Sequence, residues 1–351
     1  MKITRFISMI ALGATALAFT ACEHSATIET IVSSDGSIRR NIVLKDADSA
    51  SAHMNVFGIS EDKGWTVAFN KSAEKSNKAE ITFSKSFHSI DDANAEMNTA
   101  DEATFHIRSD MEKRFRWFYT YYRYSDTYAS LNRIRYVQQE DYFTPEDYAF
   151  IKRLPAEGKP MSKADSFFLE KLGDRIYDDF AARGFYEESF ETMMKALEAT
   201  NVAQAWRDSV MLRKESYFKE LLAAERDNFD DYSPLFSKIK GFPGDNAEIQ
   251  EAYQKLIKDF ERRGNFMTTA VNMKLVHMIE LPGAVLETNA DSVHNNRAFW
   301  APPPLRYMLG DYTMYAESRS LNIWAVVLSA IVVIATIALY IVRHKSLSTH
   351  I

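Results

Sequence analysis

The chain has 351 residues, of which 46% are hydrophobic and 26% charged, and its formal net charge is -6 at pH 7. This ordinary composition, with only 12 glycines and 9 prolines, predicts a folded protein with room for two domains and argues against long disordered tracts. A single cysteine excludes an internal disulfide and a cysteine-based zinc site.

The N-terminus has the layout of an exported bacterial lipoprotein. A basic start with Lys2 and Arg5 leads into an apolar run that is too short to span a bilayer comfortably. Residues 19–22, Phe-Thr-Ala-Cys, resemble the bacterial lipobox, although leucine is usual where Phe19 stands. This resemblance implies cleavage before Cys22 and lipidation of its thiol and new amino group, with diacylglycerol and palmitate as the lipids. The alternative is an ordinary signal peptide, cleaved nearby, that leaves Cys22 as a free thiol.

The C-terminal segment predicts a membrane span. Residues 321–342 carry no charge and, at about 1.5 Å rise per residue, form a helix of about 33 Å, enough to cross a bilayer. Trp324 and Tyr340 lie near its two edges, where amphipathic rings are favoured, and the flanking Arg343 and Lys345 predict a cytoplasmic C-terminus. The alternative is a buried core helix, against which an apolar run of this length on all faces argues.

Together the two ends place residues 22–320 on the outer side of a bacterial inner (cytoplasmic) membrane. This exported part is acidic, which does not suit nucleic acid or sustained contact with anionic headgroups. We therefore expect no nucleic-acid partner. Membrane lipid is expected as a partner through Cys22 and the span.

Strand patterns come first and last in the exported part, and a helical section separates them. Alternating residues on either side of Asp35-Gly36 predict a hairpin. Strands, then helices, then strands indicate an α+β fold, in which one antiparallel sheet domain is split by a helical insertion. The predicted parts are a signal peptide over 1–21, a first sheet part over 22–140, the insertion over 141–265, a second sheet part over 266–320, a transmembrane helix over 321–343 and a cytoplasmic tail over 344–351.

Cap and break signals divide the helical insertion. Thr144 and Ser162 each precede a helical pattern as N-cap residues, whereas Gly184 and Gly264 each predict a helix end. Three carboxylates follow the first break: Glu187, Glu188 and Glu191. We interpret them as favourable charges near a helix start rather than as acid–base groups.

An aromatic run over residues 114–124 has high strand propensity. Because rings occupy both parities of the predicted strand, both of its faces carry them. Burial on both faces under a helical layer is the favoured interpretation, and stacking on a sugar or lipid over an apolar cavity is the alternative. The candidate ligand surface consists of Phe115, Trp117, Phe118, Tyr119, Tyr121, Tyr122 and Tyr124.

Four features in order resemble the LppM-like bacterial envelope lipoproteins. They are the lipobox-like Cys22, the early strand pair around residues 34–37, the stretch IELPGAVLETNA at residues 279–290, and Trp300 ahead of the terminal helix. The resemblance covers about the first hundred and the last eighty residues and leaves out the helical section. It implies an exported α+β domain tethered to the membrane, with no enzymatic activity and no catalytic residues.

No motif in the sequence identifies a reaction. HExxH, GxSxG, Walker-type and GxGxxG patterns are absent, and Asp227, Asp230 and Asp231 lack the spacing of an EF-hand loop. We therefore predict no catalytic residues, no cofactor and no metal site. A cluster of convergent polar groups with perturbed pKa values would instead favour an enzyme.

These observations predict a membrane-anchored envelope lipoprotein that acts as a non-catalytic binding, scaffold or assembly factor. We expect a protein partner that contacts the helical insertion. Lipid or glycolipid binding by the aromatic run is the second hypothesis, and an envelope hydrolase is a disfavoured third.

Overall fold

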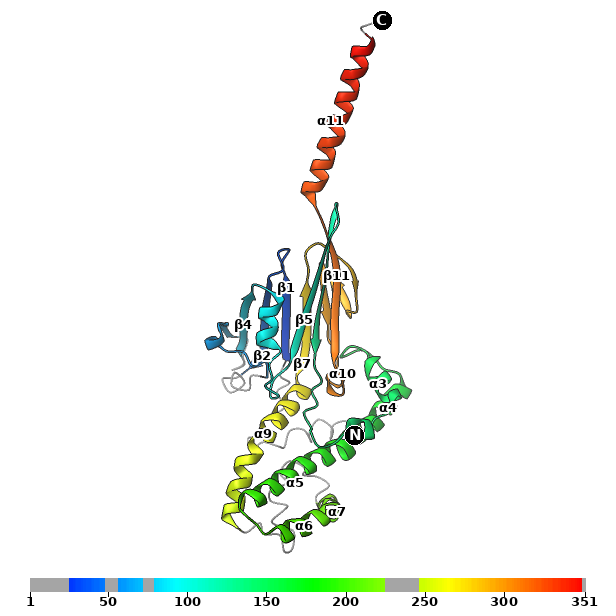
Figure 1. Ribbon diagram of the computed structural model, residues 1–351. Coiled ribbons are helices and arrows are strands. Elements are labelled where there is room, and N and C mark those ends of the chain that lie inside the picture. Colours follow the sequence, from blue (N-terminus) through cyan, green and yellow to red (C-terminus); the bar gives the residue numbers. More distant parts are fainter. Residues whose placement is uncertain (1–24, 48–55, 72–78, 225–245, 349–351) are drawn as a thin grey trace.

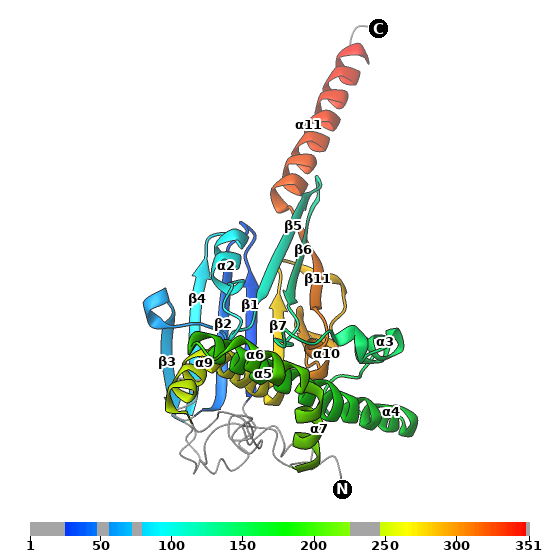
Figure 2. The same ribbon diagram turned by 60° about the horizontal axis from the view of Figure 1, so that its bottom comes forward.

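The computed structural model describes residues 25–47, 56–71, 79–224 and 246–348. Two β-sheets form a sandwich, with a helical projection at one end and helix α11 (Ile323–Ser348) at the other (Figure 1). The turned view in Figure 2 again places the projecting helices and α11 at opposite ends of the sandwich. The molecule is therefore elongated, and the sheets separate the two helical parts.

The first sheet begins with the predicted hairpin. Asp35 Oδ1 accepts a hydrogen bond from the Ser37 amide at 2.9 Å, and Gly36 has φ +99°, which suits glycine in the turn. Among the described residues this sheet has seven strands, in the spatial order β3 (Thr66–Lys71), β4 (Ala79–Phe87), β2 (Ile38–Ala47), β1 (Ser25–Val32), β7 (Lys274–Glu280), β10 (Arg297–Trp300) and β9 (Ser292–His294).

The second sheet contains the aromatic run, which is not one strand. Arg116, Trp117 and Phe118 form a turn, and the Arg116 amide donates to the Tyr119 carbonyl at 2.7 Å. The expectation of a continuous strand over 114–124 is therefore wrong, because the chain reverses direction at residues 116–118. In the described part of the chain, this sheet has four strands, in the order β5 (Ile107–Phe115), β6 (Tyr119–Tyr128), β11 (Tyr312–Leu321) and β8 (Ala284–Thr288).

The two halves of the sheet domain rejoin after the helical insertion. β7 pairs with β1, and β11 pairs with β6, so residues beyond the insertion complete both sheets. The predicted α+β fold with a helical insertion is confirmed. The structure differs in having two packed sheets and one parallel pair, β1 with β7. Parallel neighbours need a long crossover, which the intervening chain supplies.

The helical insertion begins at the predicted caps. Thr144 Oγ1 accepts from the Asp147 amide at 3.3 Å while Asp147 Oδ2 accepts from the Thr144 amide at 2.8 Å, a complete capping box. Ser162 Oγ accepts from the Asp165 amide at 3.0 Å. In the part that the structure describes, the insertion contains α3 (Pro145–Lys152), α4 (Lys163–Asp174), the π-helical η3 (Arg175–Ala181), α5 (Ala182–Ala199), α6 (Gln204–Leu212), α7 (Lys214–Ala224) and α9 (Ala247–Asn272).

Two predicted helix ends are wrong, at Gly184 and Gly264. Gly184 lies inside α5, where an added Cβ would be 2.6 Å from the Ile134 Cδ1 atom, so this glycine permits close packing rather than a C-cap. Gly264 lies inside α9, which continues because Phe266 and Ala270 are buried in the sandwich core. At these two positions, tertiary packing therefore overrides the tendency of glycine to end a helix.

Three apolar cores, counted over the described residues, hold these parts together. The largest fills the sandwich, a second joins α5, α6, α7 and α9, and a third joins α3, α4 and η3 to Leu309. Short elements complete the described chain: η1 (Glu61–Lys63), α2 (Ile90–Met97), η2 (Gln139–Asp141) and α10 (Leu305–Met308).

Candidate functional site

The tip of the β5–β6 hairpin lies against the start of α11. We call Phe115, Arg116, Trp117 and Phe118 the hairpin tip. Phe115 stacks on Trp324 with ring centroids 6.1 Å apart and planes within 6°, and Trp117 meets the same ring edge-on at 5.5 Å. Trp117 Nε1 donates to Ser329 Oγ at 2.8 Å. The contact therefore extends along the first two turns of α11.

Asn322 joins the hairpin tip to the chain that enters α11. Its Nδ2 donates to the carbonyls of Arg116 at 2.7 Å and Trp117 at 3.1 Å, and its amide donates to the Phe118 carbonyl at 2.8 Å. Thr120 Oγ1 donates to Asn322 Oδ1 at 2.9 Å. Because β11 ends at Leu321 and α11 begins at Ile323, the joint between them is the single residue Asn322. Its backbone amide and both polar atoms of its side chain are held by hydrogen bonds.

The seven predicted rings do not share one surface. Tyr122 and Tyr124 point between the sheets and are buried, whereas Tyr119 and Tyr121 are half-buried on the other face of the sheet. The three rings of the hairpin tip are about half exposed: Phe115 53%, Trp117 47% and Phe118 46%. Exposed rings in this number are uncommon on a protein surface in water and typical of a membrane interface.

The predicted membrane-interface residues lie at opposite ends of α11. Trp324 is in its first turn, and Tyr340, Arg343 and Lys345 are near its end. The helix is long and apolar enough over Ile323–Arg343 to cross a membrane. The predicted lipidation site, Cys22, lies outside the described residues.

A second polar concentration lies between the two sheets. Arg40 Nη2 on β2 donates to both carboxylate oxygens of Asp126 on β6 at 2.8 Å. Ser109 Oγ and Tyr124 OH donate to Asp126 Oδ1 at 2.6 and 2.7 Å. Burial and the negative Asp126 raise the pKa of Tyr124 far above its usual range, so it stays protonated as a donor.

His277 on β7 extends this cluster. Its Nε2 is 2.6 Å from Tyr307 OH, and its ring packs edge-on against Tyr128 at 4.8 Å. Burial lowers the pKa of His277 to about 3, so the imidazole is neutral. Among the described residues, Arg40 Nε and Nη1 and Tyr128 OH have no hydrogen-bond partner.

The cluster shows the perturbed pKa values that would favour an enzyme, but it is closed. Each residue named in it is at most 3% exposed, and these residues converge from both inner faces of the sandwich. Burial in the folded core accounts for these shifts without any catalytic role. We interpret the cluster as a polar connection between the two sheets.

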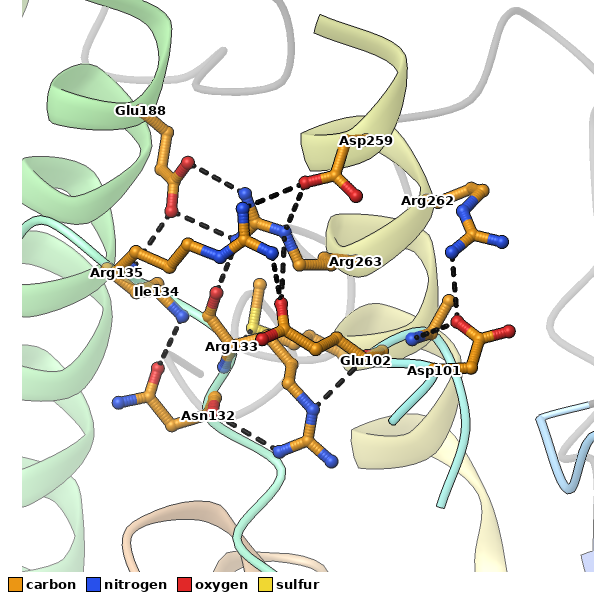
Figure 3. Close-up of polar contacts among 12 residues, drawn as sticks. Asp101, Glu102, Asn132, Arg133, Ile134, Arg135, Glu188, Asp259, Arg262 and Arg263 are labelled. Carbon is orange, nitrogen blue, oxygen red and sulfur yellow. Dashed lines mark hydrogen bonds and ion pairs between the residues drawn. The ribbon is translucent and has the colours of Figure 1, made fainter. Parts of the chain in front are cut away.

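A third network fixes the helical insertion on the sandwich (Figure 3). Glu188 on α5 and Arg263 on α9 form a bidentate pair at 2.9 and 3.0 Å, with both side chains only 2% exposed. Glu188 Oε1 also accepts from the Arg135 amide at 2.9 Å, and Arg263 donates to the Arg133 carbonyl. Burial opposes the charge of Arg263, but Glu188 and Asp259 raise its pKa above its ordinary value.

The interpretation of Glu187, Glu188 and Glu191 as charges near a helix start is wrong. All three lie beyond the first turn of α5, which continues directly from η3, and they pair with cations. Glu187 accepts from Arg183 at 2.6 Å and Lys214 at 2.5 Å, and Glu191 accepts from Lys214 at 2.9 Å. The Arg183–Glu187 spacing of four residues is the sequence signal for this arrangement, which the supposed break at Gly184 obscured.

Among the described residues, no group of three or more His, Cys, Asp or Glu side chains is placed to hold a metal ion. An open hollow of about 580 Å³ lies beside β4 and α2, and none of the seven aromatic rings lines it. Its polar groups bond to one another, since Lys85 pairs with Glu96. Its lining residues are Lys63, Lys85, Ser86, Phe87, His88, Asp92, Ala95 and Glu96.

No known protein family and no curated protein matches the sequence. Among solved structures, the NMR structure of the folded domain of Mycobacterium tuberculosis LppM is similar, with a TM-score of 0.30 and 9% sequence identity. The match covers 88% of this chain and 97% of that one. The similarity is weak and concerns the fold alone.

Proposed function

We propose that this chain is a lipoprotein of the bacterial envelope that acts as a non-catalytic scaffold or binding protein, anchored in the membrane by α11 and lipidated at Cys22. The observation that carries the proposal is the contact between the hairpin tip and α11. Rings of Phe115 and Trp117 pack on Trp324, and Asn322 bonds to three carbonyls of the tip. The body is thus fixed to its anchor rather than suspended on a linker.

The position of the helical insertion supports the scaffold role. It lies at the end of the molecule opposite α11, so an anchored body holds it away from the bilayer (Figure 1). Its described surface carries large apolar side chains, among them Phe167 at 62% and Leu212 at 87% exposure. Such residues suit contact with a protein partner. The closed polar cluster in the sandwich supports a non-catalytic role.

The anchoring part is tested by membrane extraction. Cys22→Ser should abolish labelling by a fatty-acid analogue yet leave the full chain resistant to alkaline carbonate, because α11 still spans the membrane. Removing residues 323–351 from the Cys22→Ser protein should release it into the soluble fraction. Release of the full-length Cys22→Ser protein by carbonate would contradict the anchor, and undiminished labelling would contradict lipidation.

The partner role is tested by photo-crosslinking in intact cells. A photoreactive amino acid at Phe167 or Leu212 should give one discrete protein adduct. The same amino acid at exposed Thr66 on the sandwich is the matched control and should give none. Absence of an adduct at both insertion sites, or the same adduct from all three, would argue against the insertion as the contact surface.

A further inference from the structure

We propose that the hairpin tip is itself embedded in the bilayer beside α11, with Arg116 bound to phospholipid phosphate. The inference deepens the proposed function and rests on it, because it takes α11 as a membrane span. The second membrane contact would then be a β-hairpin turn, formed by Phe115, Arg116, Trp117 and Phe118.

The length of α11 gives the first argument. The apolar segment Ile323–Arg343 has 21 residues, about 31 Å of helix, against a hydrocarbon thickness of about 30 Å. Trp117 bonds to Ser329, about 9 Å along that segment from Ile323. If the helix up to Ser329 stood in water, only about 21 Å would remain for the bilayer, and tilting would shorten the span further. To cross the bilayer, α11 must therefore have its residues up to Ser329 inside the membrane, and this places the ring of Trp117 inside the membrane too.

The backbone of the tip gives the second argument. In the hydrocarbon, an unpaired carbonyl costs several kcal/mol, so irregular backbone enters only where its polar groups are satisfied. The carbonyls of Arg116, Trp117 and Phe118 all accept hydrogen bonds from Asn322, and the Tyr119 carbonyl accepts from the Arg116 amide. The carbonyls of the turn thus have the pairing that apolar surroundings require.

The side chains give the third argument. The indole N–H of Trp117 and the hydroxyl of Ser329 pair with each other, which removes two polar groups from contact with lipid. Outside this pair the tip presents exposed rings, whose amphipathic or apolar character suits the region below the headgroups. Ala325 is fully buried, while most of the span is exposed, so the contact occupies one local patch of α11.

Charge identifies the lipid group. Lys113 donates to the Ser34 carbonyl and Arg114 pairs with Glu317, but within the described residues no acidic side chain pairs with Arg116. A long side chain from a lipid-embedded turn reaches back to the headgroups, where guanidinium binds phosphate. The acidic charge of the exported part does not prevent this, because Arg116 meets the bilayer locally with two other basic residues beside it.

The test uses the full chain in nanodiscs of phosphatidylcholine and phosphatidylglycerol. Single cysteines replace Phe118, Val332 or Lys163 in a Cys22→Ser background, and each carries a spin label. Accessibility to oxygen, which partitions into lipid, is compared with accessibility to a water-soluble nickel complex. Val332 reports the span, Phe118 the tip and Lys163 the far helical end. We expect oxygen to dominate at 332 and 118, with 118 shallower, and nickel to dominate at 163.

Each part of the claim has its own contrary result. A label at 332 in lipid with one at 118 in water overturns this inference and leaves the anchor intact, whereas a label at 332 in water overturns the proposed function itself. A label at 118 shielded from both reagents indicates a second copy of the chain over the tip and also overturns the inference. Arg116→Glu should shift the label at 118 toward water, and Arg108→Glu, at the other end of β5, should not. An unchanged depth in Arg116→Glu overturns the phosphate contact.

Discussion

The pair between Glu188 and Arg263 gives the most decisive stability prediction. Glu188→Ala removes the carboxylate that accepts two hydrogen bonds from Arg263 and one from the Arg135 amide. The Arg263 side chain is 2% exposed in the wild-type protein, and among the described residues its remaining acidic neighbours are Asp259 at 3.2 Å and the more distant Glu102. The substitution therefore leaves a buried cation with weaker compensation.

The expected loss follows from this geometry. Removing one member of a buried pair costs about 3–5 kcal/mol, and the retained Asp259 places this case near about 3 kcal/mol. Urea unfolding of the full chain in nanodiscs, followed by tryptophan fluorescence, should show the loss. Glu102→Ala is the matched control, because its pair with Arg135 is exposed and worth about 0–1 kcal/mol.

A double variant separates the ionic contribution from packing. Glu188→Leu combined with Arg263→Met replaces the pair by apolar side chains, and it should recover most of the loss. A loss below about 1 kcal/mol in Glu188→Ala, or equal losses in Glu188→Ala and Glu102→Ala, would refute this account of the junction.

Two further predictions concern the sandwich. The pKa of His277 is about 3 in the folded protein and 6.5 ordinarily, so the unfolded chain takes up the proton first and stability falls as the pH drops below about 6.5. Denaturant unfolding gives the free energy of unfolding of the wild-type protein and of His277→Gln at each pH. Between pH 8 and pH 5 the wild-type value should fall by about 2 kcal/mol more than that of the variant. Identical pH profiles would contradict a neutral buried imidazole. Gly283→Ala should lower stability by about 3 kcal/mol, because φ is +84° and a Cβ would be 2.0 Å from the Arg319 carbonyl oxygen. Gly158→Ala, with φ +77° and open space, should cost only about 1 kcal/mol in thermal unfolding, and equal losses would show that the close approach adds nothing.

Local signals explain what the sequence predicts well. The Asp35-Gly36 turn and the caps at Thr144 and Ser162 depend on groups within three residues of one another, so their structure follows from the local amino-acid sequence. The uncharged terminal run similarly suffices to predict a helix long enough to span a membrane. These features need no tertiary partner to be recognised.

The missed features depend on distant partners. The turn Arg116-Trp117-Phe118 contains no glycine, proline or asparagine, and the residue that satisfies its carbonyls, Asn322, is 206 residues away from Arg116. Glu188 and Arg263 are likewise separated by 75 residues. Gly184 resembles a helix end until Ile134 is seen against it. In each case a contact across the fold reverses the local preference.

A distance across the joint tests the central claim most directly. Spin labels at Arg108→Cys on β5 and Val332→Cys on α11, in a full-length Cys22→Ser protein in nanodiscs, report how firmly the body is fixed to its span. The account predicts one narrow distance distribution that broadens when Asn322→Ala removes the hydrogen bonds to the hairpin tip. A broad distribution already present with Asn322 intact would contradict it, because the body would then swing freely on its anchor.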